Sequence, residues 1–374
     1  MAAKKKPQFE IAIVADVHLA NHRGWGGPVG PNGLNRAAKL GIASLASAAA
    51  IAKDNGASVL IVAGDLFQTP RPEPAVIAAV QQVFSDARAN GLQVVVLPGN
   101  HDMPDATAEH GNTALAPLWS FATLVDVPTG KNFNGIDVDM VPFDGTAPMR
   151  DVLKHCGLFS PVGAPKGNPR ILVTHVGVYD DSDTKSAPWF KTAKDGIHVS
   201  ELFDIMERAG IQQAFVGNFH EHRTWSAGRL TIVQIGTLAP HSFSDAGLVR
   251  RGLVALTDGA TVITRETPGV RFLQTMGPRP EVLDDRHSYV VRQVGGARLD
   301  DSEVEAKGWL AYEHLPEKAK TEKTNLPGAR DAAPDPLTAL AAHVTEAPMP
   351  PELDSITARA KVLDLVKGAW KAAG

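Results

Sequence analysis

The chain has 374 residues, of which 44% are apolar, and a formal net charge of −4. This length predicts two or three domains, and the apolar fraction is enough for a large core. A nearly balanced charge excludes a broad basic surface, so any nucleic-acid contact must come from local patches. Cys156 is the one cysteine, which excludes an intramolecular disulfide. Because no apolar run is long enough to cross a bilayer, we expect a cytoplasmic protein with no signal peptide and no membrane contact.

Strand and helix signals alternate along the first 265 residues. Nearly continuous apolar runs predict buried strands, at 9–15, 58–63, 93–97, 136–141, 170–174, 214–216, 231–235, 253–256 and 261–265. Helices are predicted at 34–53, 74–90, 148–156 and 200–208. The second helix has a proline in its first turn and Gly91 just past its end. The alternation predicts an α/β fold, a layered β-sandwich flanked by helices.

The pattern weakens after Pro268. Short strands at 272–276, 288–294 and 309–313 predict a small α+β domain over 269–316, behind a main domain at 1–268. Residues 317–350 are charged and contain prolines, as in a linker. Residues 351–374 carry apolar side chains near helical spacing, which predicts a C-terminal helix. Its apolar face would pack on the body of the protein or on a partner.

Side chains that can bind metals follow several of the predicted strands. Four segments carry them: Asp16-Val17-His18, Gly64-Asp65, Gly99-Asn100-His101-Asp102 and Gly217-Asn218-Phe219-His220. A lone His175 follows another strand. Ligands in α/β folds gather at the carboxyl ends of strands, so we expect these side chains to lie together. Each segment taken singly is usually structural, and the order and the strand-end placement carry the prediction.

Carboxylate, amide and imidazole ligands suit manganese, iron or zinc better than a thiolate-seeking ion. Two such ions about 3.5–4 Å apart would polarise a phosphate and deprotonate a water. His101 then needs a separate role, since it is adjacent to a ligand-type asparagine. We expect it to face the substrate and to protonate the leaving alkoxide, with Asp102 orienting its ring and raising its pKa.

The series resembles the calcineurin-like metallophosphoesterase superfamily, whose pattern is Asp-x-His, Gly-Asp, Gly-Asn-His-Asp/Glu, a lone His and Gly-His-x-His. The resemblance covers roughly residues 9–265. A narrower segment, Gly64-Asp65-Leu66-Phe67 followed by Arg71-Pro72-Glu73-Pro74, is similar to the SbcD-type nuclease subunits of bacterial and bacteriophage DNA double-strand-break repair complexes. That likeness implies a capping domain after the catalytic domain and a helical segment that docks on a coiled-coil SbcC-like ATPase.

The resemblance also implies roles for single residues. One ion would be held by Asp16, His18, Asp65 and His220, and the other by Asp65, Asn100, His175 and Asn218. Manganese is the ion expected, with magnesium, iron and zinc as alternatives. His101 would face the substrate, with support from Asp102.

Two positions depart from the family pattern. Gln68 stands where the cellular nucleases usually carry a histidine linked to exonuclease handling of the scissile phosphate, although its amide could still donate to a phosphate. Asn218 stands where a histidine is expected, and an amide oxygen is the weaker ligand. The prediction is therefore an asymmetric pair whose Asn100, His175 and Asn218 side binds its ion more weakly. Two alternatives stay open: His220-Glu221-His222 as the shifted His-x-His pair, and Asn218 as an introduced substitution.

The leading hypothesis is a two-metal DNA nuclease, acting by exo- or endonucleolytic cleavage, in an SbcCD-like complex, with a homodimer as a further expectation. The alternatives are a phosphodiesterase on small substrates such as cyclic nucleotides, and a weakened scaffold that binds DNA ends. Predicted substrate contacts are Gln68, Arg71, Arg23 and His222. Further candidates for the DNA groove are His22, Trp25, His110, Trp189, Lys191 and Arg223.

Overall fold

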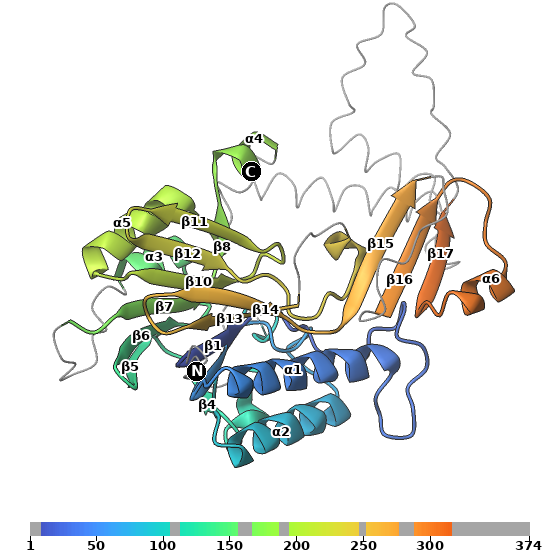
Figure 1. Ribbon diagram of the computed structural model, residues 1–374, viewed down its shortest axis with the longest axis horizontal. Coiled ribbons are helices and arrows are strands. Elements are labelled where there is room, and N and C mark those ends of the chain that lie inside the picture. Colours follow the sequence, from blue (N-terminus) through green and yellow to red (C-terminus); the bar gives the residue numbers. More distant parts are fainter. Residues whose placement is uncertain are drawn as a thin grey trace, which may run out of the picture. The chain divides into compact units, whose positions relative to one another are not determined.

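The computed structural model describes residues 9–104, 113–155, 167–186, 194–246, 252–276 and 288–315 (Figure 1). Within these ranges the strands form two six-stranded sheets, a three-stranded sheet and a two-stranded sheet. Some predictions fall outside the described residues. These are the linker at 317–350, the C-terminal helix at 351–374, and the candidate DNA contacts His110, Trp189 and Lys191.

The first large sheet has the strand order β14-β13-β1-β2-β3-β4. Its strands are β1 (Ile11–Val14), β2 (Val59–Ala63), β3 (Gln93–Leu97), β4 (Thr123–Leu124), β13 (Leu253–Thr257) and β14 (Val262–Glu266). The four strands from β1 to β4 are parallel, whereas β13 is antiparallel to β1 and to β14. Parallel neighbours point their carboxyl ends to one edge, so the loops after β1, β2 and β3 meet there.

The second large sheet has the strand order β11-β12-β10-β7-β6-β5. Its strands are β5 (Thr129–Phe133), β6 (Ile136–Val141), β7 (Arg170–His175), β10 (Gln213–Gly217), β11 (Arg223–Ala227) and β12 (Leu230–Gln234). The four central strands are parallel, and the edge strands β5 and β11 pair antiparallel with β6 and β12. The loops after β7, β10 and β12 therefore also leave from a common edge.

Apolar side chains on alternate faces of each strand fill three layers of core. Ile11 and Ile13 of β1 point between the two sheets, where they share a core with Val173 and Phe215 of the second sheet. Helices α1 (Arg36–Asp54) and α2 (Pro74–Ala89) cover the other face of the first sheet, and α3 (Met149–His155) and α5 (Val199–Ala209) cover the second (Figure 1). The predicted sandwich flanked by helices is confirmed. Strands buried on both faces read as continuous apolar runs, which is why the sequence revealed them.

Helix ends follow local sequence signals. The Asn35 side chain accepts a hydrogen bond from the Ala38 amide at the start of α1, and Pro74 opens α2. Gly210 ends α5 in the left-handed region at φ 68°. Several short elements escaped prediction. They are the strands β4, β5, β8 (Gly177–Tyr179), β9 (Gly196–His198) and β11, the helices α4 (Asp181–Ser186) and α6 (Asp301–Ala306), and the 3-10 helices η1 (Ala116–Leu118) and η4 (Phe243–Asp245).

A separate parallel sheet comprises β15 (Val270–Met276), β16 (Ser288–Val294) and β17 (Ala311–Leu315), with α6 (Asp301–Ala306) between the last two. One face packs around Leu299 and Trp309. On the other face, the ring of Phe272 meets Trp25 at 5.5 Å and Phe243 at 5.1 Å between centroids. This sheet lies in the segment predicted as the capping domain, and the domain boundaries stay predictions.

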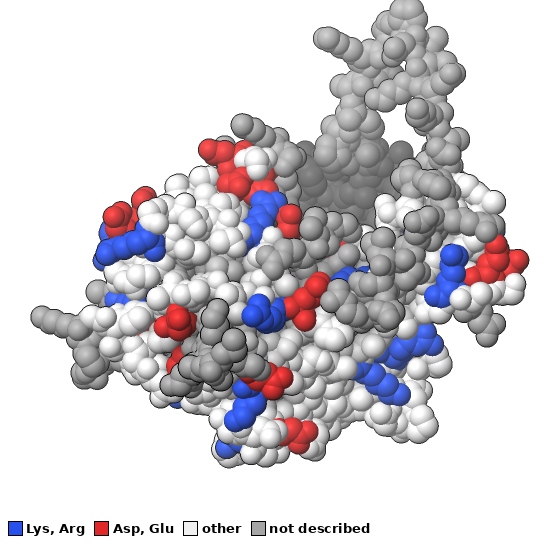
Figure 2. Space-filling view, in the orientation of Figure 1, with Lys and Arg blue, Asp and Glu red and all other residues white. Residues whose placement is uncertain are grey.

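The charged side chains on the face shown in Figure 2 are interspersed in sign, with broad neutral areas between them. On this face the described residues thus form no broad basic patch, and any anionic polymer would have to be held by local contacts. Within the described part of the chain, no helix combines the length and apolar character needed to cross a membrane.

Candidate metal centre

The predicted ligands come together where the strands of both large sheets end. Asp16 and His18 follow β1, Asp65 follows β2, and Asn100 follows β3. From the second sheet, His175 ends β7 and His220 follows β10. A parallel bridge between Ala15 and Thr237 joins the loops after β1 and β12 at this edge. The two sheets thus present their loops to the same place, as expected for ligands in α/β folds.

Backbone strain is concentrated at these residues. Among the described residues, positive φ outside glycine occurs at Asp16 (52°), His18 (50°), Asp65 (52°), Asn218 (89°) and Asn134 (46°). Four of these five are predicted ligands. Such conformations cost on the order of 1–3 kcal/mol each and persist where the surrounding structure enforces them, commonly at functional sites. The strain therefore marks the site independently of the side-chain chemistry.

Two glycines make room for the ligands. Gly64 has φ of 89°, and a Cβ there would collide with the His175 ring. A Cβ on Gly99 would collide with the carboxylate and amide of Asp65. Because backbone and ligand side chain are in direct contact, any larger residue at 64 or 99 would displace a ligand.

One half of the site, here called the oxygen-rich side, consists of Asp16, Asp65, Asn100 and His175. Asp16 and His175 are fully buried. His175 Nε2 lies 3.0 Å from Asn100 Oδ1 and 3.4 Å from Asp65 Oδ2, while its Nδ1 lies 2.9 Å from the Ala63 carbonyl oxygen. The carbonyl fixes Nδ1 as the protonated nitrogen and leaves Nε2 facing the oxygens, which is how imidazole ligands are commonly oriented.

The pKa shifts on the oxygen-rich side arise because several ionisable groups are buried close together. Burial lowers the pKa of His175, but Asp65 and Asp16 outweigh it and raise that pKa to about 10. Burial raises the pKa of Asp16 to about 6 against the attraction of His175. Burial also acts to raise the pKa of Asp65, yet His175 and His18 bring it well below its usual range. In the metal-free protein a proton on His175 therefore supplies the positive charge that the carboxylates require.

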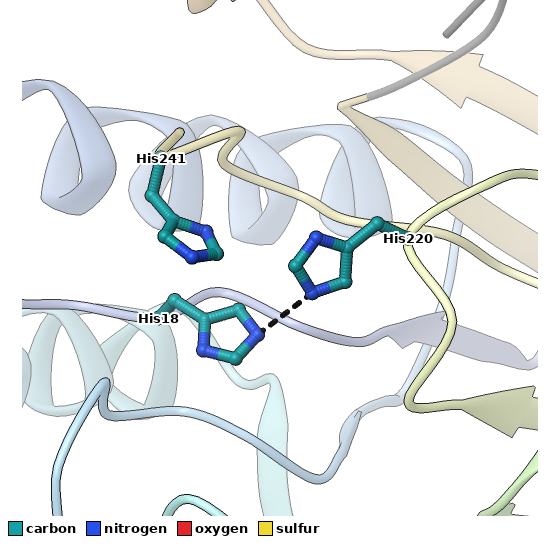
Figure 3. Close-up of side chains that lie close together, drawn as sticks. All are labelled: His18, His220 and His241. Carbon is teal, nitrogen blue, oxygen red and sulfur yellow. Dashed lines mark hydrogen bonds between the residues drawn. The ribbon is translucent and has the colours of Figure 1, made fainter. Parts of the chain in front are cut away.

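The other half, here called the histidine cluster, consists of His18, His220 and His241 (Figure 3). Their rings converge from the loops after β1, β10 and β12, with His18 Nε2 3.0 Å from His220 Nε2. Burial lowers the pKa of His18 well below its usual value and that of His241 to about 4. Burial opposes the charged form of His220 too, but the Asp245 carboxylate raises its pKa. His18 and His241 thus present neutral imidazoles at neutral pH.

The geometry and chemistry of these groups fit divalent metals. Two nitrogens at about 2.1 Å from one ion lie roughly 3.0 Å apart at a right angle and about 3.4 Å apart at a tetrahedral angle, and the His18 and His220 Nε2 atoms are separated by 3.0 Å. Asp65 Oδ2 is 3.6 Å from His18 Nε2 and 3.4 Å from His175 Nε2, so one carboxylate faces both halves. His18 Nδ1 is buried without a hydrogen-bond partner among the described residues. The donor set of carboxylate, amide and imidazole is that of manganese, iron or zinc.

The grouping differs from the expected one in two respects. Asp16 lies with Asp65 and His175 in a group whose ligand atoms are within 4.8 Å of one another, although its charge also acts on His220. The His101 ring is grouped with His18 and Asp65, beside the ligands of the histidine cluster. The Asp16 carboxylate also accepts the Asn218 amide N–H at 3.0 and 3.1 Å.

The side chains of His101 and Asp102 lie beside the ligands. The Asp102 carboxylate was expected to hold the His101 ring, but its hydrogen bonds go to backbone N–H groups instead. The Asp102 carboxylate, fully buried, accepts the backbone N–H groups of Leu66 (3.2 Å), Phe67 (2.9 Å) and Gly99 (3.0 Å). Burial raises its pKa to about 7. The ring of His101 is oriented by the Gln68 carbonyl oxygen, 2.9 Å from Nδ1. Correcting the prediction, Asp102 ties the loops after β2 and β3 together, and the Gln68 carbonyl orients His101.

The side chains of Asn218 and His222 each have a backbone carbonyl oxygen as a hydrogen-bond partner. Besides its bonds to Asp16, Asn218 donates its side-chain amide to the Asp195 carbonyl oxygen at 3.0 Å. His222 Nδ1 lies 3.2 Å from the Ile235 carbonyl oxygen. Among the described residues, the His, Asp and Glu groups close enough to hold a metal include His220 and not His222. The geometry thus favours His220 over the shifted His-x-His pair.

The remaining predicted contacts fall into two kinds. Arg23 and Arg71 are exposed, and Gln68 is half-buried. Trp25 is instead engaged in packing: its Nε1 donates to the His241 carbonyl oxygen at 3.0 Å and its ring contacts Phe272. Arg223 forms ion pairs with Asp183 and Glu221. Of these predicted contacts, Arg23 and Arg71 are thus the cations that are exposed to solvent.

Sequence reasoning missed His241 and Asp245. Asp245 Oδ1 is 2.6 Å from His220 Nδ1, and Oδ2 accepts the His241 backbone N–H at 3.0 Å. The sequence does hold a signal for Asp245, because Ser242 and Asp245 have the Ser-x-x-Asp spacing of a capping box, which η4 forms. His241 has no such signal, since it lies seven residues beyond β12, in a loop whose course depends on the whole fold.

The structure combines a two-sheet sandwich with potential metal ligands at its strand ends. The family model described as calcineurin-like phosphoesterase matches residues 9–199, about half of the chain. The chain belongs to this calcineurin-like family, and with it to the metal-dependent phosphoesterases.

Solved structures were also compared. TT1561 of Thermus thermophilus is 14% identical, with 69% of this chain and 99% of that chain covered and a TM-score of 0.42. A second solved structure is 12% identical over 68% of this chain and 98% of its own, with a TM-score of 0.40. No curated protein sequence matches the chain.

Proposed function

We propose that the protein is a two-metal-dependent DNA nuclease that serves as the nuclease subunit of an SbcCD-like repair or recombination complex. The observation that carries the two-metal part is the position of Asp65. Its Oδ2 lies 3.6 Å from His18 Nε2 and 3.4 Å from His175 Nε2, between the two halves of the site. When bound, two divalent cations, manganese foremost, supply the charge that polarises a phosphodiester and activates a water.

The protein's own residues hold the reacting groups in place. Asp65 Oδ1 accepts the His101 backbone N–H at 2.9 Å, so the substrate-facing histidine is fixed to the shared ligand. The Gln68 carbonyl oxygen binds Nδ1 of His101 and leaves Nε2 to take up or release a proton. A proton delivered from Nε2 would neutralise the leaving alkoxide as the phosphodiester breaks. The ring lies at 4.8 Å from the His18 ring, beside the ligands.

The choice of DNA rests on the segment from Gly64 to Pro74. It connects the shared ligand Asp65 to the start of α2, and it carries the Leu-Phe and Arg-Pro-x-Pro features of SbcD-type nucleases. Arg71 in this segment is exposed, as is Arg23 after the first motif. Exposed arginines on both loops would contact phosphates outside the scissile one, a use that a small substrate does not offer. The proposed docking of 351–374 on an SbcC-like ATPase rests on the sequence.

The test compares linear DNA with a small chromogenic phosphodiester, each incubated with the metal-loaded chain. We expect manganese-dependent DNA cleavage that is lost in His101→Asn and kept in Asp139→Asn. The control replaces a buried carboxylate that pairs with Arg170 in the second sheet, away from the ligands.

Three results would contradict the proposal. Turnover of the small diester without DNA cleavage would favour the small-substrate alternative. DNA-end binding by a chain that takes up no metal would favour the scaffold. Absence of cleavage by the wild-type chain, by Asn218→His, and by either with a coiled-coil ATPase added would end the nuclease assignment.

A further inference from the structure

We infer that His241 is a third imidazole ligand and that, with His18 and His220, it forms a site selective for a borderline transition metal such as zinc. This inference rests on the metal-dependent part of the proposed function and not on DNA as the substrate. It assigns the two halves of the centre to different classes of metal.

The geometry of the histidine cluster carries the inference. One ring nitrogen from each of His18, His220 and His241 lies within 4.8 Å of the other two. The ring centroids of His18 and His241 are 4.5 Å apart, and those of His220 and His241 are 5.3 Å apart. The three rings point toward one another from separate loops (Figure 3). Three convergent imidazoles and the shared Asp65 carboxylate, whose Oδ2 lies 3.6 Å from His18 Nε2, supply the four donors of a zinc site, which can expand to five-coordinate to take a water or a substrate oxygen.

His241 is held in this position by several groups. Its backbone N–H donates to Asp245 Oδ2 at 3.0 Å, and its carbonyl oxygen accepts Trp25 Nε1 at 3.0 Å. Its ring stacks on His22 with centroids 5.3 Å apart and planes 25° apart. His22 Nε2 lies 2.9 Å from the His18 carbonyl oxygen, which fixes the stacking partner to the first ligand loop. The ring is thus placed by contacts on both sides rather than by the cluster alone.

Asp245 acts as a shared outer partner for the cluster. Its Oδ1 lies 2.6 Å from His220 Nδ1, which directs His220 Nε2 toward His18 as the available ligand atom. Its other oxygen holds the His241 backbone. A carboxylate behind a metal-binding histidine fixes the tautomer and raises the basicity of the ligand. Here one carboxylate, 1% exposed, places two of the three rings.

The two halves therefore offer different donors. The histidine cluster presents three nitrogens, whereas the oxygen-rich side presents Asp16, Asp65 and Asn100 oxygens with the single His175 imidazole. Imidazole donors favour zinc and its neighbours, and carboxylate and carbonyl oxygens favour manganese and magnesium. A mixed pair, with zinc at the histidine cluster and manganese on the oxygen-rich side, follows from this division.

The experiment measures zinc binding by the full chain without any substrate. The chain is stripped of metal and titrated with zinc against a chromophoric chelator. We expect one zinc ion to bind tightly, His241→Ala to weaken that binding by at least about 100-fold, and Asp245→Asn to weaken it by roughly 10–100-fold. The matched control is His155→Ala, which removes an exposed histidine at the end of α3, outside the cluster, and should leave the zinc affinity unchanged.

If His241→Ala fails to fold, X-ray absorption at the zinc edge of the wild-type chain still tests the inference. The wild-type chain loaded with one equivalent of zinc should show three imidazole ligands. One or two imidazoles, or unchanged zinc affinity in a folded His241→Ala chain, would overturn the inference. Neither the zinc titration nor the X-ray absorption measurement involves DNA. If the chain cleaves DNA with manganese but does not bind zinc through three imidazoles, only the inference about His241 is refuted. Three-imidazole zinc without DNA cleavage would refute the nuclease proposal alone.

Discussion

The oxygen-rich side and the histidine cluster meet at Asp65 but are built differently. Asp16 and His175 are fully buried, and backbone groups such as the Ala63 carbonyl and the Asn218 amide hold them. The side chains of His220 and His241 are 23% and 15% exposed, and one carboxylate, Asp245, positions both. The oxygen-rich side is thus held by backbone groups at strand ends, whereas His220 and His241 of the histidine cluster lie nearer to solvent and share one carboxylate.

The largest expected effect comes from removing the residue that both halves share. Asp65→Asn keeps the shape of the side chain but removes the charge that faces His18 and His175. We expect loss of both metal ions and a fall in phosphodiesterase activity of at least about 1000-fold. Metal content by mass spectrometry and turnover of a chromogenic diester measure it. Retention of two ions would show that the halves are independent of Asp65.

A smaller effect is expected from crowding the shared ligand without changing it. In Gly99→Ala the new methyl group would collide with Asp65, which must then move. Displacement of a catalytic group by about 1 Å costs roughly 100-fold in rate. The control is Gly24→Ala, where a Cβ meets nothing within 4 Å. Equal activity of the two variants would contradict the proposed close contact between Gly99 and Asp65.

Asn218→His addresses the oxygen-rich side alone. The change keeps the backbone N–H that binds Asp16 and offers an imidazole in place of an amide. We expect manganese to bind this side about tenfold more tightly, since imidazole is the better ligand for a transition metal. Isothermal titration of the metal-free chain measures it, with Asn218→Ala as the matched variant that keeps the backbone but adds no ligand. Equal affinity of the histidine and alanine variants would remove the predicted asymmetry.

The two halves should also differ in the number of protons that each releases when it binds its metal. With its pKa raised to about 10, His175 is protonated in the metal-free protein at neutral pH, whereas His241, with a pKa of about 4, is not. Binding of manganese on the oxygen-rich side must therefore release about one proton, and zinc binding needs none from His241. Affinity for manganese should then rise with pH, by about tenfold per unit between pH 7 and 9. Calorimetry in buffers of different ionisation enthalpy counts the protons, and no release would contradict the charge on His175.

The sequence by itself determined the α/β layers and the strand ends that carry ligands. Continuous apolar runs, for example at 93–97, revealed strands buried on both faces, and β3 has those bounds. Strand-end placement also predicted that Asp16, Asp65, Asn100 and His175 would meet, because parallel strands share an edge. The strands β4, β5, β8, β9 and β11 were missed, since each is too short or too polar for its periodicity to be recognised.

Tertiary structure decided what each ligand contacts. His241 and Asp245 reach the site through a loop after β12, and the partners of Asp245 lie up to 25 residues away in sequence. The same holds for Asp102, whose backbone partners Leu66 and Phe67 lie 36 and 35 residues away. Contacts over such separations arise because strands that are distant in sequence, such as β2 and β3 or β10 and β12, are neighbours in a sheet and bring their following loops together. Neither local propensity nor motif spacing encodes them. Motifs therefore set which residues could bind metal, and sheet packing set how they are divided into two different halves.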